Sequence, residues 1–291
     1  MRPRWCVPVA TLALAGGALL PLVGTAAVSS AATRSGHVSM AIRSGHVRLV
    51  PRSRYVRVIP RSRRERVQLG GRAHMIRPFI SFRRGRNAVT SSNWSGYVAH
   101  NGPYKSISAS WVEPTGHCNG SGHKYSSFWV GLDGYSSHSV EQTGSEVDCK
   151  GGTPKYYSWF EMYPKYPVIF RNTVRPGDHF RGSVTYNGGG KFTLTLSDTT
   201  RSWTHTVHKS LRSAPRSSAE VIIEAPCCTR SGGPLPLADF GTVHLSSASV
   251  NDSEIGSHNP TKVIMQAGSM RKDAISRLAN GQRFSATWRH S

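Results

Sequence analysis

The segment HFRGSVTYNGGGKFTLTLSD, residues 179–198, decides the fold class of this chain. Polar and apolar residues alternate on both sides of Asn187-Gly188-Gly189-Gly190, and a glycine-rich turn between two such runs predicts a β-hairpin. Similar short runs recur toward both ends of the region from about residue 94 to 288, separated by Gly, Asn, Asp and Pro. Only KDAISRLAN (272–280) is expected to form a short helical turn. Ten or more short strands at this spacing predict an all-β protein, an antiparallel β-sandwich or barrel.

Charge is distributed unevenly along the 291 residues, which carry 37 Lys+Arg against 15 Asp+Glu, a formal net charge of +22. Residues 33–86 contain fifteen Arg and a single acidic residue, Glu65, for a local charge of +14. Residues 87–291 carry only +6 and are numerous enough to bury one good core. No helix-turn-helix, zinc-finger or ribonucleoprotein signature is present, so we do not expect a nucleic-acid-binding protein.

Residues 1–32 have the features of a secretory signal peptide. Arg2 and Arg4 precede the apolar run 7–23, and small residues follow at Ala27 and Ala32. The run is shorter than a membrane span and contains Gly16, Gly17 and Pro21. We therefore expect a secreted, extracellular protein without stable membrane insertion.

Residues 33–86 repeat with a period of nine, because Arg-Ser begins at 34, 43, 52 and 61. Units this short and basic can bury little apolar surface, so we expect a segment of low order. One interpretation is a propeptide that is removed after export. The other is a basic tail that binds a polyanionic wall, lipid or nucleic acid.

Five cysteines are present, and Cys6 lies in the predicted signal peptide. The remaining four, in an exported domain, predict disulfide bonds. Two longer-range bridges compete with Cys118–Cys149 plus a bond between the neighbours Cys227 and Cys228. Zinc is the less favoured alternative, because no pair has CxxC spacing.

Candidate catalytic residues are polar side chains within strand-like sequence, since GxSxG, HExxH, Walker and dinucleotide motifs are all absent. Glu220 and Glu224 would share one face of a strand, and Trp159, Glu161 and Tyr163 one face of another. Gln142 lies in a third segment. A sheet face with carboxylates, an amide and aromatic rings suits a polar polymer, although each residue alone is also compatible with an ordinary solvated strand face.

Eight segments, in order over roughly residues 92–250, resemble motifs of the glutamic peptidases, or eqolisins. They are SNWSGY (92–97), WVEP (111–114), FWVGLDG (128–134), QTG (142–144), WFEMYP (159–164), PGD (176–178), SAEVIIE (218–224) and ADFGTV (238–243). The chain departs from the family pattern at Met162 and Val221, where the family has Trp.

The resemblance implies a sandwich of two long antiparallel sheets, like the concanavalin lectins, over residues 87–291. It implies a catalytic dyad of Gln142 and Glu224. Glu220 is the neighbouring glutamate that could be confused with Glu224 in the same motif. It also implies substrate-binding roles for the groove residues, which are Trp129, Asp133, Glu146, Glu161 and Glu220. We expect no metal or cofactor.

This dyad would suit the hydrolysis of peptide bonds in protein or peptide substrates. Ionised Glu224 can accept a proton from water as general base and return it to the leaving amine. Gln142 can donate its amide N–H to the tetrahedral oxyanion. Because an unperturbed Glu titrates near 4.3, we expect activity at about pH 3–5. The basic segment 33–86 would cover the acidic groove before activation.

Two other functions fit the same residues. Glu161 and Glu224, with Trp129 and Trp159 as stacking platforms, would suit a protein that binds or cleaves carbohydrate. A catalytically inactive relative that has kept the fold is the third class.

Overall fold

Strands dominate the computed structural model, which describes residues 83–84, 88–227 and 233–291. The predicted signal peptide, and the predicted basic segment apart from Arg83 and Arg84, lie outside these residues. The described residues belong to one compact unit, Leu69–Ser291. None of the helices in the described ranges is long and apolar enough to cross a membrane.

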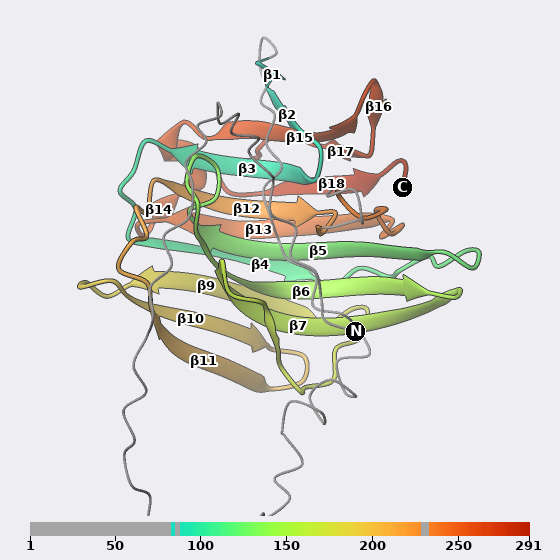
Figure 1. The fold of residues 1–291 in the computed structure, drawn as a ribbon, viewed down its shortest axis with the longest axis horizontal. Helices are drawn as coiled ribbons and strands as arrows, with labels where there is room; N and C mark the ends of the chain where they lie inside the picture. Colours follow the sequence, from blue (N-terminus) through green and yellow to red (C-terminus); the bar gives the residue numbers. More distant parts are fainter. Residues whose placement is uncertain (1–82, 85–87, 228–232) are drawn as a thin grey trace, which may run out of the picture. The chain divides into compact units, whose positions relative to one another are not determined.

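Within the described part of the chain, two sheets form the sandwich (Figure 1), with the following strands. Sheet A has ten strands: β1 (Arg83–Arg84), β2 (Val89–Ser91), β15 (Thr261–Ala267), β3 (Trp94–His100), β12 (Ser218–Glu224), β5 (His123–Leu132), β6 (Val140–Lys150), β7 (Thr153–Tyr163) and β8 (Val168–Ile169) in spatial order, with β16 (Met270–Arg271) beside β15. Sheet B has eight: β11 (Trp203–Ser210), β10 (Lys191–Asp198), β9 (His179–Tyr186), β4 (Ser106–Val112), β13 (Thr242–Val250), β18 (Phe284–Trp288) and β17 (Asp273–Ile275), with β14 (Ser253–Glu254) beside β13. A short 3-10 helix, η1, covers Ile255–His258. The predicted antiparallel sandwich is confirmed, although β2 and β15 pair in parallel.

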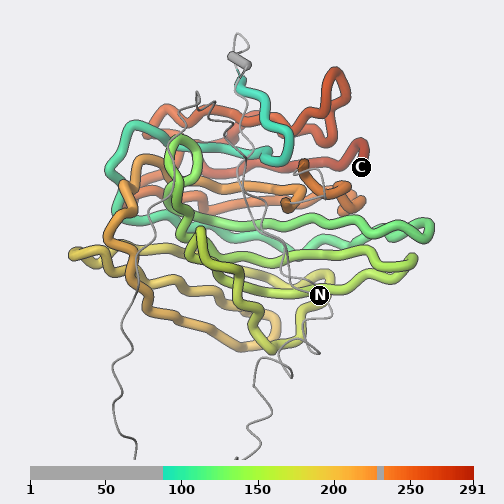
Figure 2. Tube along the Cα trace, viewed as in Figure 1, coloured from blue at the N-terminus to red at the C-terminus, as the bar shows by residue number. Residues whose placement is uncertain are grey.

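The hairpin predicted from 179–198 is β9 and β10, which pair in register from Tyr186–Phe192 to Phe180–Asp198. Strands β9, β10 and β11 follow one another along the chain. They lie side by side at one edge of sheet B, with β11 outermost (Figure 2). The short helical turn predicted at KDAISRLAN is wrong. Asp273–Ile275 form β17 and pair with β18, and Asp273 and Ile275 are buried on one side of the strand, the period of a strand rather than of a helix.

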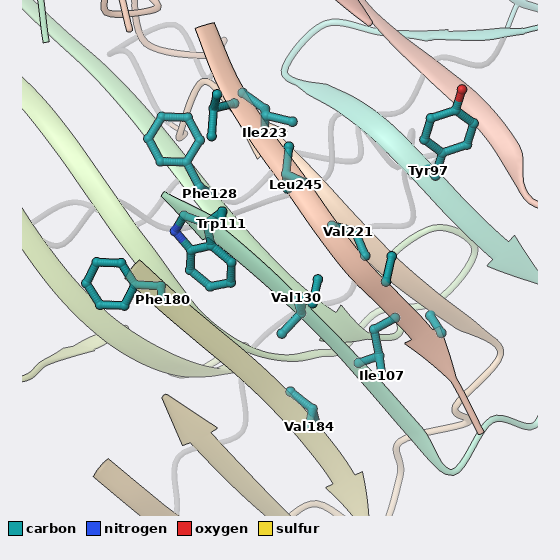
Figure 3. Close-up of a cluster of buried hydrophobic side chains, with 14 of the residues drawn as sticks. Tyr97, Ile107, Trp111, Phe128, Val130, Phe180, Val184, Val221, Ile223 and Leu245 are labelled. Atoms are coloured by element: carbon teal, nitrogen blue, oxygen red, sulfur yellow. The ribbon is translucent and has the colours of Figure 1, made fainter. Parts of the chain in front are cut away.

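The main core lies between the sheets, where alternate side chains of both meet (Figure 3). Phe128, Val130, Val221 and Ile223 come from sheet A and pack with side chains of sheet B that include Ile107, Trp111, Phe180, Val184 and Leu245. Trp111 and Phe180 stack with ring centroids 5.7 Å apart. Because neighbouring residues of a strand point to opposite faces, this packing leaves Glu220, Ile222 and Glu224 of β12 on the face of sheet A that points away from sheet B. We call it the distal face.

A disulfide bond joins Cys118 to Cys149, which excludes the connectivities that pair either residue with Cys227 or Cys228. The bond ties the segment after β4 to the end of β6. Cys227 is also disulfide-bonded.

Candidate active site on the distal face

Strand register aligns the predicted site residues in rows across β12, β5, β6 and β7. Each row contains one residue from each strand, and the side chains of all three rows point to the distal face. The rows are Glu220–Gly131–Gln142–Glu161, Ile222–Trp129–Gly144–Trp159 and Glu224–Ser127–Glu146–Tyr157. Trp94, Trp129, Trp159 and Ile222 belong to a second apolar cluster on this face.

Trp129 connects the two members of the predicted dyad. Its indole Nε1 donates a hydrogen bond of 2.9 Å to Glu224 Oε2. At the other side of the ring, a Cβ placed on Gly131 would lie 2.9 Å from Trp129 Cζ3 and 3.1 Å from Gln142 Cβ. The indole therefore extends from the carboxylate of Glu224 toward the base of the Gln142 side chain.

Gly144 is required for this arrangement. A Cβ on Gly144 would collide with the carbonyl oxygen of Phe128 and lie 2.6 Å from Trp129 Cβ, closer than real Cβ atoms approach. The glycine of the QTG segment thus lets β6 pass close to Trp129, which explains why this small residue is needed two positions after Gln142.

Glu224 is fully buried and accepts hydrogen bonds at both oxygens. Asn93 Nδ2 donates to Oε1 over 2.9 Å, and Trp129 donates to Oε2. Burial raises the pKa of Glu224 well above its ordinary value, and the charges of Glu161 and Glu146 raise it further, while the indoles of Trp94 and Trp129 act in the opposite direction. The surroundings thus hold a carboxyl group in place and make its proton unusually difficult to remove.

Asn93 was not among the predicted site residues. The Ser91 hydroxyl donates to Asn93 Oδ1 over 3.2 Å, and Asn93 Nδ2 donates to Glu224. The sequence offered one signal, since Asn93 begins the strand-like NWSGY segment as a polar residue beside an indole.

Gln142 and Glu161 are direct cross-strand neighbours on β6 and β7. Gln142 Nε2 donates to Glu161 Oε2 over 2.7 Å, and both side chains are fully buried. Gln142 Oε1 has no hydrogen-bond partner within the described part of the chain. The amide is therefore held by one N–H, and its carbonyl oxygen and second N–H remain available for chemistry at the distal face.

Asp133 has a different environment from the other predicted site residues. It follows β5 with a φ of 71°, and its carboxylate accepts hydrogen bonds from the backbone N–H of Arg216 (2.7 Å) and of Ser217 (2.8 Å). The Ser217 hydroxyl adds a third, of 3.1 Å. These contacts fix the segment before β12, so the observed role of Asp133 is to anchor a loop.

Glu220 shares a row with Gln142 but lies across Gly131 from it. Its pKa is raised well above the ordinary value by burial, and further by the charges of Asp133 and Glu141. Neither oxygen of Glu220 has a geometrically good hydrogen bond to a described residue. The carboxyl group of Glu220 is therefore influenced by the charges of Asp133 and Glu141, whereas that of Glu224 is influenced by the charges of Glu161 and Glu146. The two glutamates belong to separate groups of carboxyl side chains.

Metal-ligating side chains do not gather within the described ranges. No group of three or more His, Cys, Asp or Glu there has the geometry to hold a metal ion.

Comparison with known proteins identifies the family and the fold of the chain. The model of the Peptidase A4 family matches residues 92–282. A search of curated proteins finds no match to the chain. Among solved structures, the chain is similar to scytalido-glutamic peptidase with a transition state analog inhibitor, at 24% identity and a TM-score of 0.59, over 68% of this chain and 98% of that one.

Two further structures have the same fold. SCP-B, an eqolisin in complex with the tripeptide Ala-Ile-His, has 22% identity and a TM-score of 0.57 over 68% of this chain and 98% of that one. The aspergilloglutamic peptidase from Aspergillus niger has 23% identity and a TM-score of 0.51 over 57% and 99%. The sandwich is thus the fold of a peptidase class. The chain belongs to the Peptidase A4 family, the glutamic peptidases, and is a hydrolase of the glutamic endopeptidase type.

Proposed function

We propose that this protein is a secreted acid endopeptidase that cleaves peptide bonds with a dyad of Gln142 and Glu224. The observation that carries the proposal is that Glu224 and Gln142 lie on either side of the Trp129 indole. The Glu224 carboxyl group is buried and hydrogen-bonded, and Gln142 Oε1 has no hydrogen-bond partner in the described part of the chain. The proposal extends to acid activity, secretion and the roles of the individual residues.

Glu224 is proposed as the general base. Asn93 and Trp129 donate to its two oxygens, so they favour the ionised form and fix the orientation in which it meets a water molecule. After accepting a proton from water, Glu224 can transfer it to the nitrogen of the leaving amine, which completes hydrolysis without another acid.

Gln142 is proposed to stabilise the tetrahedral intermediate. Glu161 accepts one N–H of the amide and so determines which way the amide points. The second N–H can then donate to the developing oxyanion, and the unpaired Oε1 can accept from the attacking water.

The need for an ionised base sets the lower pH limit of the proposed acid activity. An exposed glutamate would be half ionised near pH 4.3, but burial raises the pKa of Glu224. The activity should therefore rise at a higher pH than it would if the base were an exposed glutamate. The maximum should lie toward the upper end of the acid range.

Digestion of casein by the purified chain, after incubation at acid pH, tests the proposal. Activity is measured from pH 2 to 8 with pepstatin present, because a glutamic peptidase needs no aspartic dyad. We expect a maximum in the acid range and a loss of about 10²–10³ in rate for Gln142→Ala. A carbohydrate-binding or carbohydrate-cleaving protein would digest no casein, and its glycan binding would only weaken in Gln142→Ala.

We also propose that the basic segment 33–86 inhibits the site before activation. Its +14 charge complements the carboxyl groups of the distal face, and protonation of these groups should release it. A synthetic 33–86 peptide should inhibit the acid-incubated protein more tightly at pH 7 than at pH 3. Equal inhibition at both pH values would exclude this mechanism.

Secretion is tested by the N-terminus of the protein recovered from the culture medium. A chain that begins after the 1–32 segment would support export by a cleaved signal peptide. Retention of the intact chain in the cell would contradict it.

A further inference from the structure

A second carboxyl pair lies on the distal face beyond the proposed dyad. Glu146 and Asp148 are alternate residues of β6, so both point to the same face as Gln142. Glu146 occupies the row of Glu224, separated from it by Ser127 alone. The pair therefore adjoins the proposed base along the sheet.

Two tyrosines flank this pair. Tyr125 of β5 is directly opposite Asp148, and Tyr157 of β7 is directly opposite Glu146. Burial raises the pKa of Tyr157 to about 12, with further contributions from the negative charges of Asp148 and Glu146 and from Tyr125. The four residues thus form two adjacent cross-strand pairs on one face, and aromatic rings beside carboxylates are the usual surroundings of a bound organic cation.

The pair is buried at its base and open at its rim. Asp148 is only 6% exposed, and its Oδ1 has no hydrogen-bond partner among the residues that the structure describes. Glu146, Tyr125 and Tyr157 are each partly exposed. A ligand can therefore approach from the rim and reach a buried acceptor that this part of the chain leaves unpaired, a state that costs free energy until a donor arrives.

Charges of both signs surround the pair, because Lys150 follows Asp148 on the same face of β6 and Lys155 of β7 is directly opposite Asp148. Burial raises the pKa of Glu146 to about 6 and that of Asp148 well above its usual range, where the charge of Glu146 adds to the effect. Lys150 acts in the opposite direction on Asp148 but does not offset burial. Two carboxyl groups this close retain a proton because they cannot both ionise easily, and a cation that replaced the proton would remove that conflict.

We propose that Glu146, Asp148, Tyr125 and Tyr157 form a subsite for the guanidinium group of an arginine in the peptide substrate. The planar guanidinium can donate to both carboxyl groups at once and stack on a tyrosine ring, which a lysine ammonium cannot do in the same way. This inference deepens the proposed peptidase function and rests on it, because the subsite lies next to the proposed base.

Isosteric peptides test the subsite without any mutation. Two series of peptides carry arginine or its neutral isostere citrulline at each position in turn around a cleavage site. The acid-incubated full chain should cleave the arginine peptide at least about tenfold faster at one position, measured as kcat/KM. Equal rates at every position would overturn the subsite while leaving the peptidase function intact, whereas failure to cleave any peptide would contradict the peptidase function itself.

Direct binding makes the subsite testable even without turnover. The Glu224→Gln chain should bind the arginine peptide at least about tenfold more tightly than the citrulline peptide at pH 7, by calorimetry. Equal affinities would overturn the subsite whatever the activity of the wild-type protein.

Variants then assign the preference to the pair. Asp148→Asn and, at the partly exposed position, Glu146→Gln should each bring the arginine-to-citrulline ratio close to one. Asp252→Asn is the matched control, because Asp252 is exposed and lies next to β14 of sheet B. Thermal unfolding establishes that each variant is folded. An arginine preference that persists in folded Asp148→Asn and Glu146→Gln would overturn the assignment.

Discussion

The two faces of β12 differ in chemistry although every residue of the strand is buried. Ala219, Val221 and Ile223 point into the core between the sheets, and Glu220 and Glu224 point to the distal face. Burial stabilises the protein on the first face, because it removes apolar surface from water. On the distal face, burial raises the pKa of the carboxyl groups. The free energy gained in the core offsets the cost of removing these groups from water. The inner face thus accounts for the fold, and the distal face is available for chemistry.

A cavity in the inner face gives the largest expected effect. Phe128 is fully buried and packs edge-to-face against Phe240, with centroids 5.5 Å apart. Phe128→Ala should lower the free energy of unfolding by about 3–5 kcal/mol, measured by urea denaturation. A loss below about 1 kcal/mol would show that the inner face is not the main source of stability.

Mutation of Asp133 tests whether this residue has a structural role or a substrate-binding role. Asp133→Ala removes the acceptor for the backbone N–H groups of Arg216 and Ser217 and should cost about 1–3 kcal/mol of unfolding free energy. Asp133→Asn, which keeps one acceptor and tolerates a positive φ, should cost less. A large change in KM at unchanged stability would instead assign Asp133 to substrate binding.

Buried carboxyl groups should make the fold more stable in acid than at neutral pH. Burial raises the pKa of Glu113 to about 8 and that of Glu141 to about 9, so the folded state binds protons that the unfolded state releases. Stability is then fully present below about pH 4.5 and is lost as the pH rises through these folded-state values. Between pH 5 and 8, Glu113→Gln should reduce the fall in unfolding free energy by at least about 1.4 kcal/mol, one pKa unit. Glu254→Gln, an exposed control, should leave the slope as it is, and an unchanged slope in Glu113→Gln would contradict the prediction.

The smallest predicted effect comes from removing one hydrogen bond to Glu224 on the distal face. Trp129→Phe keeps an aromatic ring but removes the N–H that donates to Glu224. Loss of a donor to the carboxylate should raise the pKa of Glu224, moving the acid limb of the activity profile upward by about one pH unit. A limb that stays in place would mean that Glu224 is not the group that titrates.

The fold class was predictable from sequence because it depends on local patterns, and the site segments were predicted from their resemblance to motifs of the glutamic peptidases. Alternation around Asn187–Gly190 predicts the hairpin, and the register of short strands then aligns Gln142, Glu161 and Glu224 on one face. The role of Asp133 depends instead on the segment at Arg216 and Ser217, more than eighty residues away, and no local pattern reveals such a contact. The donor role of Asn93 and the strand at Asp273–Ile275 likewise depend on tertiary neighbours, which override local preference.

The central claim is that Glu224, and not Glu220, acts as the base. It is tested most directly by kcat/KM of the acid-incubated wild-type, Glu224→Gln and Glu220→Gln proteins on one peptide across pH 2–8. The account predicts a loss of at least about 10³ for Glu224→Gln and a loss within about tenfold for Glu220→Gln. A greater loss in Glu220→Gln, or full activity in Glu224→Gln, would contradict it.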